Sequence, residues 1–377
     1  MLGKSIGELA DRCARTGTIL LIASIAGALA SCASTGSAGS EEVEQPELLY
    51  PPPPEQARFV FERTISSSAD ITVEDSESKW RRILTGEVDD SAAFSKPFDV
   101  VACQGRVYVS DTVRRSVLVF DVPQAKFSEI GIVEPGELRK PLGMAVDADC
   151  NLFVVDGTLK RVVVFDPDGN FITAFGGTDM FQRPSHIDVD IEGRYAYVVD
   201  TGGVDNDLHR VRVFDIASGE HAFDIGRRGS EAGQFNLPRD IAVAPDGNVY
   251  VVDAANFRVQ VFEADGTYLN QFGRVGSYPG NFSRPKGVDS DASGNIYVSD
   301  AGFGNFQIFD SAGNLLLFIG NRANTPGPAR YMLPAGIAVD EDGRVYMVDQ
   351  FYRKVDVFRP AELAPGDGYL GARAALN

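Results

Sequence analysis

The sequence predicts an all-β protein, a six-bladed β-propeller whose blades are four-stranded antiparallel sheets. Two observations indicate this fold: one unit of β-patterned runs recurs six times, and its copies follow one another at a regular distance. The aspartates that end the second run of successive copies lie between 44 and 53 residues apart, a period typical of propellers and arrays. Six copies favour a ring, because closing a ring removes exposed sheet edges.

The repeat is clearest in residues 237–262, LPRDIAVAPDGNVYVVDAANFRVQVF. Its first two β-patterned runs are joined by Asp246-Gly247, where glycine supplies the positive φ that a tight hairpin turn needs. Every copy starts with a proline, namely Pro97, Pro141, Pro184, Pro238, Pro285 and Pro334. Every second run ends with an aspartate, namely Asp111, Asp156, Asp200, Asp253, Asp300 and Asp349.

Two of these segments, LPRDIAVAPDGNVYVVD and LPAGIAVDEDGRVYMVD, resemble NHL repeats, which build propellers in many bacterial envelope proteins. The resemblance covers roughly residues 94–359. It implies the propeller fold and leaves the function open, since one fold serves many functions.

Residues 1–31 have the pattern of a lipoprotein signal peptide. A basic start precedes an apolar run at 18–29 that is too short to span a bilayer. The run ends in Leu-Ala-Ser-Cys, which resembles the lipobox of bacterial lipoproteins and implies cleavage before Cys32 and a diacylglycerol on its thiol. An ordinary signal peptide with an incidental cysteine is the alternative. Ala33 replaces the aspartate associated with inner-membrane retention, which favours the outer membrane, on its periplasmic or its surface side.

Residues 32–57 form a predicted tether of Ser, Gly, Glu and Pro. Residues 58–65, RFVFERTI, then form a predicted isolated strand, and 361–377 a C-terminal tail after a propeller that spans 58–360. The sixth copy lacks a fourth run, so we expect the strand at 58–65 to complete the last blade and close the ring. Residues 74–84 are predicted to be a short helix that Trp80 packs down.

The formal net charge of the chain is −18. An acidic surface repels nucleic acid and anionic lipid headgroups. We therefore expect no nucleic-acid partner, and a membrane attachment that depends on the lipid anchor alone.

The repeat explains most of the charged residues. Four of the second-run aspartates face a cation across the hairpin, at Arg161, Arg210, Arg258 and Lys354, so charge pairing is the expected role of these aspartates. In the fifth copy no local cation is available to Asp300. Asp300 is therefore a candidate for a ligand-binding role.

The second residue after each lead proline is expected at the mouth of the central channel. Three of these positions are polar, Asp99, His186 and Asp240, and three are glycine. His186 and Asp240, together with His209, Asp205 and Asp207 near the enlarged loop 202–208, would suit a divalent metal, the one cofactor that the sequence suggests. The alternative is that the polar residues bond only to water or to neighbours.

Cys103 and Cys150 lie in equivalent turns of adjacent copies. Cys150 stands where the other copies have glycine, which indicates a positive φ that cysteine adopts at a cost. We expect a disulfide between them to offset this cost in an oxidising compartment. Two half-buried thiols are the alternative.

Propellers similar to NHL repeats include an amidating lyase whose metal is held by three histidines. Only His186 lies at a comparable position, so the resemblance does not carry that activity over.

The face with the loops between second and third runs offers the aromatics Phe257, Phe303, Phe351 and Tyr352 beside arginines, a combination typical of protein-binding hot spots. The expected function is a lipid-anchored scaffold that binds a protein or an extracellular polymer; a metal-dependent lyase or hydrolase is the alternative.

Overall fold

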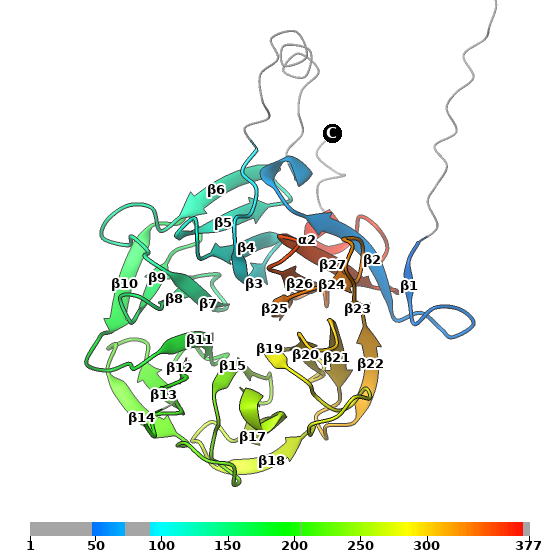
Figure 1. Cartoon of the computed structure of the whole chain (residues 1–377). Coiled ribbons are helices and arrows are strands. Elements are labelled where there is room, and N and C mark those ends of the chain that lie inside the picture. Colours follow the sequence, from blue (N-terminus) through cyan, green and yellow to red (C-terminus); the bar gives the residue numbers. More distant parts are fainter. Residues whose placement is uncertain (1–46, 72–90, 204, 372–377) are drawn as a thin grey trace, which may run out of the picture. The chain divides into compact units, whose positions relative to one another are not determined.

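The computed structural model describes residues 47–71, 91–203 and 205–371. These residues form a ring of six blades around a central axis (Figure 1), so the predicted six-bladed β-propeller is confirmed. The signal peptide, Cys32 and the helix at 74–84 with Trp80 lie outside the described residues.

In the first five blades four consecutive strands pair in chain order, and the first strand of each lies nearest the axis (Figure 1). Blades one and two consist of β3 (Pro97–Cys103), β4 (Arg106–Asp111), β5 (Ser116–Asp121), β6 (Lys126–Ile130), β7 (Pro141–Val146), β8 (Leu152–Asp156), β9 (Arg161–Phe165) and β10 (Phe171–Gly176). Blades three to five consist of β11 (Pro184–Val189), β12 (Tyr195–Asp200), β13 (Arg210–Asp215), β14 (His221–Ile225), β15 (Pro238–Val243), β16 (Val249–Asp253), β17 (Arg258–Phe262), β18 (Tyr268–Phe272), β19 (Pro285–Ser290), β20 (Ile296–Asp300), β21 (Asn305–Phe309) and β22 (Leu315–Ile319).

Blade six is built from both ends of the described chain. Its inner strands are β25 (Pro334–Val339), β26 (Val345–Asp349) and β27 (Lys354–Pro360), and β2 (Phe59–Ile65) pairs antiparallel with β27. The predicted closure of the ring by the N-terminal strand is therefore confirmed (Figure 1). A fifth strand, β1 (Leu49–Tyr50), adds to β2 within the segment expected to be a tether.

The regular elements outside the blades are short. They are the 3-10 turns η1 (Ser68–Asp70) and η2 (Ala254–Asn256), the parallel strand pair β23 (Asn321–Arg322) and β24 (Arg330–Tyr331), and the helix α2 (Gly368–Gly371). Among the described residues, no helix has the length and the apolar character that crossing a bilayer requires.

The residue three positions before each lead proline packs the end of the third strand. In blade four, for example, Phe235 lies with its ring centroid 5.5 Å from that of Phe262. The chain turns sharply to reach this position: Gly273 has a φ of 79°, and a Cβ there would lie 2.2 Å from Phe282. Only glycine fits such a turn, which explains why a glycine follows the fourth strand, as at Gly226, Gly273 and Gly320.

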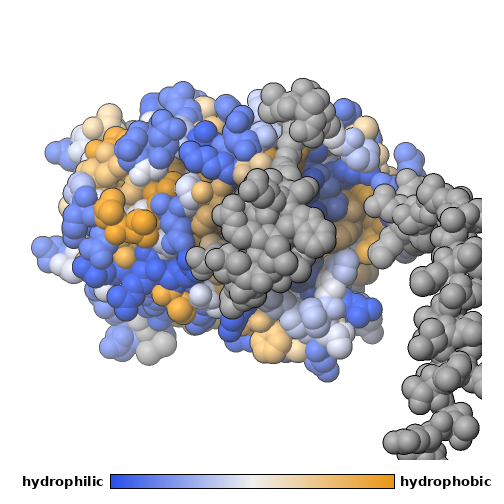
Figure 2. All heavy atoms as spheres, turned by 90° about the horizontal axis from the view of Figure 1, so that it is seen from above, coloured by the Kyte–Doolittle hydropathy of each residue, from blue (hydrophilic) through white to orange (hydrophobic). Residues whose placement is uncertain are grey.

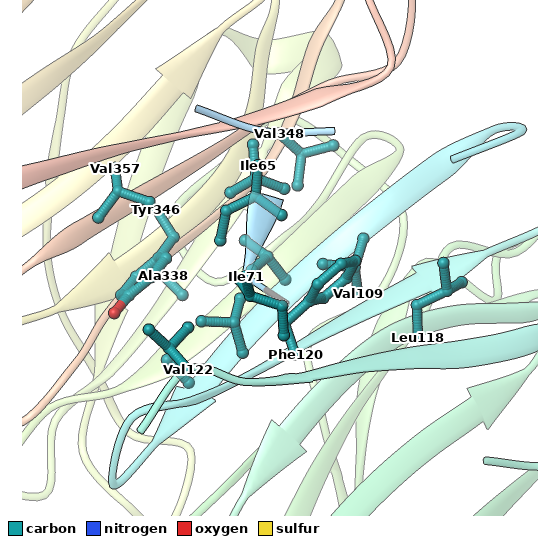
Figure 3. Close-up of a cluster of buried hydrophobic side chains, with 14 of the residues drawn as sticks. Ile65, Ile71, Val109, Leu118, Phe120, Val122, Ala338, Tyr346, Val348 and Val357 are labelled. Atoms are coloured by element: carbon teal, nitrogen blue, oxygen red, sulfur yellow. The ribbon is translucent and has the colours of Figure 1, made fainter. Parts of the chain in front are cut away.

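The apolar side chains form six buried clusters, and each cluster is shared by two adjacent blades. Figure 3 shows the cluster between blades six and one, where Ile65 of β2 lies near Val348 and Phe120. At the rim of the ring, hydrophobic residues gather only in small patches between hydrophilic ones (Figure 2). The core therefore lies between blades, and β2 contributes to it directly.

Candidate functional site

The ring has two different faces. The inner strands begin on one face, which we call the proline face; Pro97 pairs there with Asp111, the last residue of β4. The loops between second and third strands lie on this face too. The opposite face carries the turns between first and second strands, and we call it the turn face.

The six aspartates that end the second strands are all fully buried on the proline face. All six carboxylates accept hydrogen bonds from backbone amides just before the lead proline. Four of them also accept from amides in the loop after the second strand, namely those of Asp111, Asp156, Asp300 and Asp349. Asp300, for instance, accepts from the amides of Ser283 and Arg284 before the lead proline and from those of Gly302 and Phe303 in the following loop. Each aspartate therefore fixes the chain where it enters its blade, and four of them also fix the loop between the second and third strands.

The expectation that these aspartates pair with third-strand cations is wrong in half of the cases. Arg258 forms an ion pair with Asp253 at 2.9 Å, and Arg210 approaches Asp200 to 3.6 Å. Lys354 instead pairs with Asp356. Arg161 donates to backbone carbonyls, at Pro135 and Glu137. Backbone amides satisfy the aspartates without a cation, which also accounts for Asp300.

Four carboxylates on inner strands each bond to the next blade, and together they join blade one to two, three to four, four to five and five to six. Asp99 and Asp240 accept hydrogen bonds from the amides of Met144 and Val288, at 2.8 Å and 2.9 Å. Two further aspartates were missed in the sequence because they stand four residues after the proline, not two. They are Asp188 and Asp289, which accept from the amides of Val243 and Val339 at 2.6 Å and 2.7 Å.

Burial makes these inner carboxyls weak acids. Burial raises the pKa of Asp99 and that of Asp188 to about 7. Burial also raises the pKa of Asp240 and Asp289 well above the ordinary value, and a neighbouring carboxyl adds to it, Asp99 in the first case and Asp188 in the second. Desolvation disfavours the charged form and like charges act in the same direction. Asp99 and Asp188 therefore exchange a proton near neutral pH.

The channel contains a cavity of about 510 Å³ that runs from Asp99 and Asp240 to the turns of the turn face. Its lining includes further acids at those turns, namely Asp147, Asp190, Asp291, Asp340 and Glu341, and none of the described lysines, arginines or histidines. Tyr369 of the C-terminal helix α2 also lines it. The tight turns of the turn face therefore border a cavity.

The candidate metal ligands do not form a metal site. His209 is fully buried; its Nε2 lies 2.9 Å from the Gly203 carbonyl and its Nδ1 accepts from the Leu237 amide at 3.1 Å. Asp240 is engaged with amides of blades four and five. Within the part of the chain that the structure describes, no three His, Cys, Asp or Glu side chains are grouped as metal ligands would be.

His186 lies at the proline end of the channel, as expected. Its ring packs 5.2 Å from that of Phe98, across Gly143 of the intervening blade. A Cβ at Gly143 would lie 2.4 Å from the Cα of His186, so glycine is needed for this contact. Burial lowers the pKa of His186 to about 3, and the charges of Arg239 and Lys286 add to the effect. The imidazole is therefore neutral.

Cations surround this end of the channel. Arg239 and Lys286 directly follow their lead prolines, and Arg183 and Arg284 directly precede theirs. Burial lowers the pKa of Lys286 to about 8, and repulsion by Arg239 and Arg284 contributes. Burial also lowers the pKa of Arg239, with repulsion by Arg183 and Arg284. In the sequence these cations stand in three different copies, and only their shared position beside the lead prolines indicates that they belong together.

The aromatic candidates differ in exposure. Phe351 is 59% exposed on the proline face. Tyr352 is anchored, since its hydroxyl donates to the Ala323 carbonyl at 2.8 Å. Phe257 packs against the cluster between blades four and five, and Phe303 is half-buried. Of these four candidates, Phe351 is thus the most accessible to a partner.

The structure joins Cys103 and Cys150 in a disulfide with a Cα–Cα distance of 5.9 Å. Cys150 has a φ of 59°, in the region that the glycines of the other blades occupy. Both residues are buried between blades one and two. The bond links these blades at the turn face.

Residues 235–262 match the NHL repeat family. The protein brain tumor of Drosophila melanogaster is 25% identical over 163 residues, which are 42% of this chain and 14% of that protein. A probable peptidyl-alpha-hydroxyglycine alpha-amidating lyase of Caenorhabditis elegans is 28% identical over 116 residues, 30% of this chain and 31% of that protein. The chain therefore spans less than a third of the length of either relative.

Solved structures share the fold at low sequence identity. A Bacteroides thetaiotaomicron protein of unknown function superposes with a TM-score of 0.57 and 17% identity, over 81% of this chain and 76% of that chain. A gluconolactonase of Xanthomonas campestris gives a TM-score of 0.54 and 18% identity, over 80% and 98% of the two chains. These likenesses establish the architecture alone.

Proposed function

This chain is a six-bladed β-propeller of the NHL-repeat type, and we propose that it acts as a lipid-anchored binding scaffold of the cell envelope. Its ligand, a protein or an extracellular polymer, binds to the proline face. The anchor is the lipid on Cys32, which places the protein on the outer membrane.

The observation that carries this proposal is an accessible apolar surface on rigid loops. Phe351 is 59% exposed and Val113 is 62% exposed, both in loops between second and third strands. The Asp349 carboxylate holds the amide of Phe351 at 2.9 Å, and that of Asp111 holds the amide of Val113 at 3.0 Å. Loops that a rigid scaffold presents in this way commonly carry binding function.

A comparison of the two faces tests the proposal. Partners are crosslinked to the full chain in intact cells and captured, and Phe351→Ala is compared with Ile191→Ala, which removes an equally accessible apolar side chain from the turn face. We expect Phe351→Ala to weaken partner capture about fivefold or more, with an unchanged melting temperature. Loss of capture in Ile191→Ala alone would place binding on the turn face and overturn the proposal.

The anchor has its own test. Cys32→Ser is expected to move the protein from the membrane fraction to the soluble fraction and to abolish labelling by a radioactive fatty acid. Cys13→Ser, which lies within the expected signal peptide, serves as the control and should leave both unchanged. Membrane association of Cys32→Ser equal to that of the unaltered chain would contradict lipid anchoring.

The alternative, a metal-dependent lyase or hydrolase, draws support from the partial similarity to amidating lyases. The residues fit it poorly, because His209 uses both ring nitrogens within its own loop and with Leu237. A stoichiometric divalent ion in the purified protein would favour this alternative.

A further inference from the structure

Four cations from three adjacent blades converge on the proline end of the channel. Arg183 comes from blade three, Arg239 from blade four, and Arg284 and Lys286 from blade five. They are close enough for mutual repulsion, since Arg183 and Arg284 both act on Arg239. The fold thus gathers positive charge at one point of a chain whose net charge is −18.

These four side chains have no counter-charge of their own. Among residues 47–71, 91–203 and 205–371, none of the four forms an ion pair or donates a side-chain hydrogen bond. Arg239 and Lys286 are partly buried as well. Unpaired cations that are both clustered and desolvated destabilise a fold, so such an arrangement commonly marks a site where an anion binds.

His186 provides a second, independent observation at the same place. The residue is only 7% exposed, and its Nδ1 has no hydrogen-bond partner in the described residues. The backbone of Arg239 lies beside the ring, and burial keeps the imidazole neutral. With the proton of the neutral ring on Nε2, toward that backbone, the free Nδ1 is an acceptor for an O–H or N–H donor.

We propose that this mouth binds a phosphate group of the ligand, in which Arg239 and Lys286 contact the oxyanion and His186 Nδ1 accepts a hydrogen bond from a P–OH or a neighbouring hydroxyl. The inference rests on the proposed function and names the chemistry of its ligand. A carboxylate carries one negative charge, whereas a phosphate monoester carries about −1.5 to −2 at neutral pH, a closer match to four cations. The net charge of −18 disfavours an anionic bilayer as the source.

Titration calorimetry with inorganic phosphate on the full chain, in a phosphate-free detergent, tests the site. We expect saturable binding that Arg239→Gln with Lys286→Gln weakens at least about tenfold. The matched control is Lys96→Gln, an exposed cation that also precedes a lead proline but lies in blade one; it should change the affinity less than about twofold. Equal affinity in the double variant and the unaltered chain, or no saturable binding at millimolar phosphate, would overturn the proposal.

The role of His186 predicts a specificity. Hydrogen phosphate offers an O–H and sulfate does not, so phosphate should bind about tenfold more tightly than sulfate. His186→Phe keeps a ring beside Phe98 and should abolish this preference while retaining anion binding. An equal preference in His186→Phe would contradict the assigned contact.

Lys286 supplies a further readout. Because its pKa is lowered to about 8 in the free protein, binding of an anion near pH 8 should draw a proton onto it, which titrations in buffers of different ionisation enthalpy measure. The proton uptake should vanish in Lys286→Gln and persist in Lys96→Gln.

Tighter binding to phosphatidic acid vesicles than to free phosphate would contradict a soluble ligand. If phosphate does not bind while Phe351→Ala still weakens partner capture, the scaffold proposal stands and the phosphate site is refuted.

Discussion

Arg344 donates a hydrogen bond from Nε to Oε2 of Glu62 at 2.8 Å, although 282 residues separate the two in the chain. The Arg344 side chain is completely buried. Its other nitrogens bond to the Asp342 carboxylate and to the carbonyl of Asp367, each at 2.7 Å. One guanidinium therefore joins the N-terminal strand, the last blade and the C-terminal segment.

Breaking this contact should destabilise the ring. Arg344→Ala removes a fully buried side chain and leaves the half-buried carboxylates of Glu62 and Asp342 without their cation, and we expect a loss of about 3–5 kcal/mol in the free energy of unfolding. Glu62→Gln retains the shape and an acceptor, and should lose only about 1–2 kcal/mol. Urea denaturation measures both, and equal losses in the two variants would show that the ion pair is not what matters.

Deletions test the closure of the ring as a whole. A chain that starts at Ser66 lacks β2 and exposes the edge of β27, so we expect aggregation or a loss of several kcal/mol. A chain that starts at Glu55 keeps β2 but loses β1, the contact of Tyr50 with Phe358, whose ring centroids lie 5.7 Å apart, and the ion pair of Glu47 with Arg359 at 2.8 Å. Its loss should be about 1–2 kcal/mol. Indistinguishable melting of the two deletions would refute the role of β2.

The disulfide should contribute substantially to stability. It closes a loop with a sequence separation of 47 residues, which corresponds to about 4 kcal/mol in the loop-entropy treatment. Two double variants without the disulfide are compared by their free energy of unfolding. The first combines Cys103→Ser with Cys150→Gly, and the second combines Cys103→Ser with Cys150→Ser. Glycine accepts the positive φ at position 150 freely, so the first pair should be the more stable by roughly 1 kcal/mol. Two free thiols at these positions in the denatured, unreduced protein would disprove the bond.

The channel carboxyls predict a pH dependence of stability. The folded-state pKa of Asp99 and of Asp188 is raised to about 7, while an unfolded aspartate titrates near 4. Between these values the folded protein binds more protons, so their contribution is fully present below about pH 4 and is lost as the pH rises through about 7.

We therefore expect the free energy of unfolding to be at least ~2 kcal/mol larger at pH 5 than at pH 8. Asparagine does not titrate, so the double variant Asp99→Asn with Asp188→Asn should reduce this pH dependence, and the part that remains comes from Asp240 and Asp289. A stability that is constant or rises between these pH values would refute the assignment.

Asp300 should act through backbone amides and not through charge pairing. Asp300→Ala leaves four amides without an acceptor, and we expect a loss of about 3 kcal/mol or more, whereas Asp300→Asn keeps one oxygen and should lose about 1–2 kcal/mol. Asp265→Ala, in an exposed turn, is the control and should change stability by less than about 1 kcal/mol. A loss in Asp300→Ala no larger than in this control would contradict the structural role.

Most of the fold could be predicted because each blade has the same types of residue at the same structural positions. A proline, a buried apolar side chain such as Phe235 and an aspartate such as Asp253 recur in every blade with little change, so one copy predicts the others. The closure by residues 59–65 was predictable for a related reason: only the last repeat lacks a fourth strand of its own.

The site was less predictable because it depends on how different blades approach one another. Asp188 and Asp289 stand at another position of their inner strands than Asp99 does, and a bulge follows Pro184 and Pro285. Arg239 and Lys286 are unremarkable within their own repeats and meet only when the ring closes. The net charge of −18 gives no sign of this local concentration of cations.

The pairing of β2 with β27 also determines when the molecule can be completed during synthesis. Residues 59–65 leave the ribosome before the six repeats, and their partner strand leaves after nearly all of them. Blades one to five can form their own hairpins as they emerge, but the first strand then has no edge to join. Until Pro360 is available, both that strand and the edge of blade six stay open to proteases and to other chains. A nascent chain of this protein therefore reaches its protected state only at the end of translation.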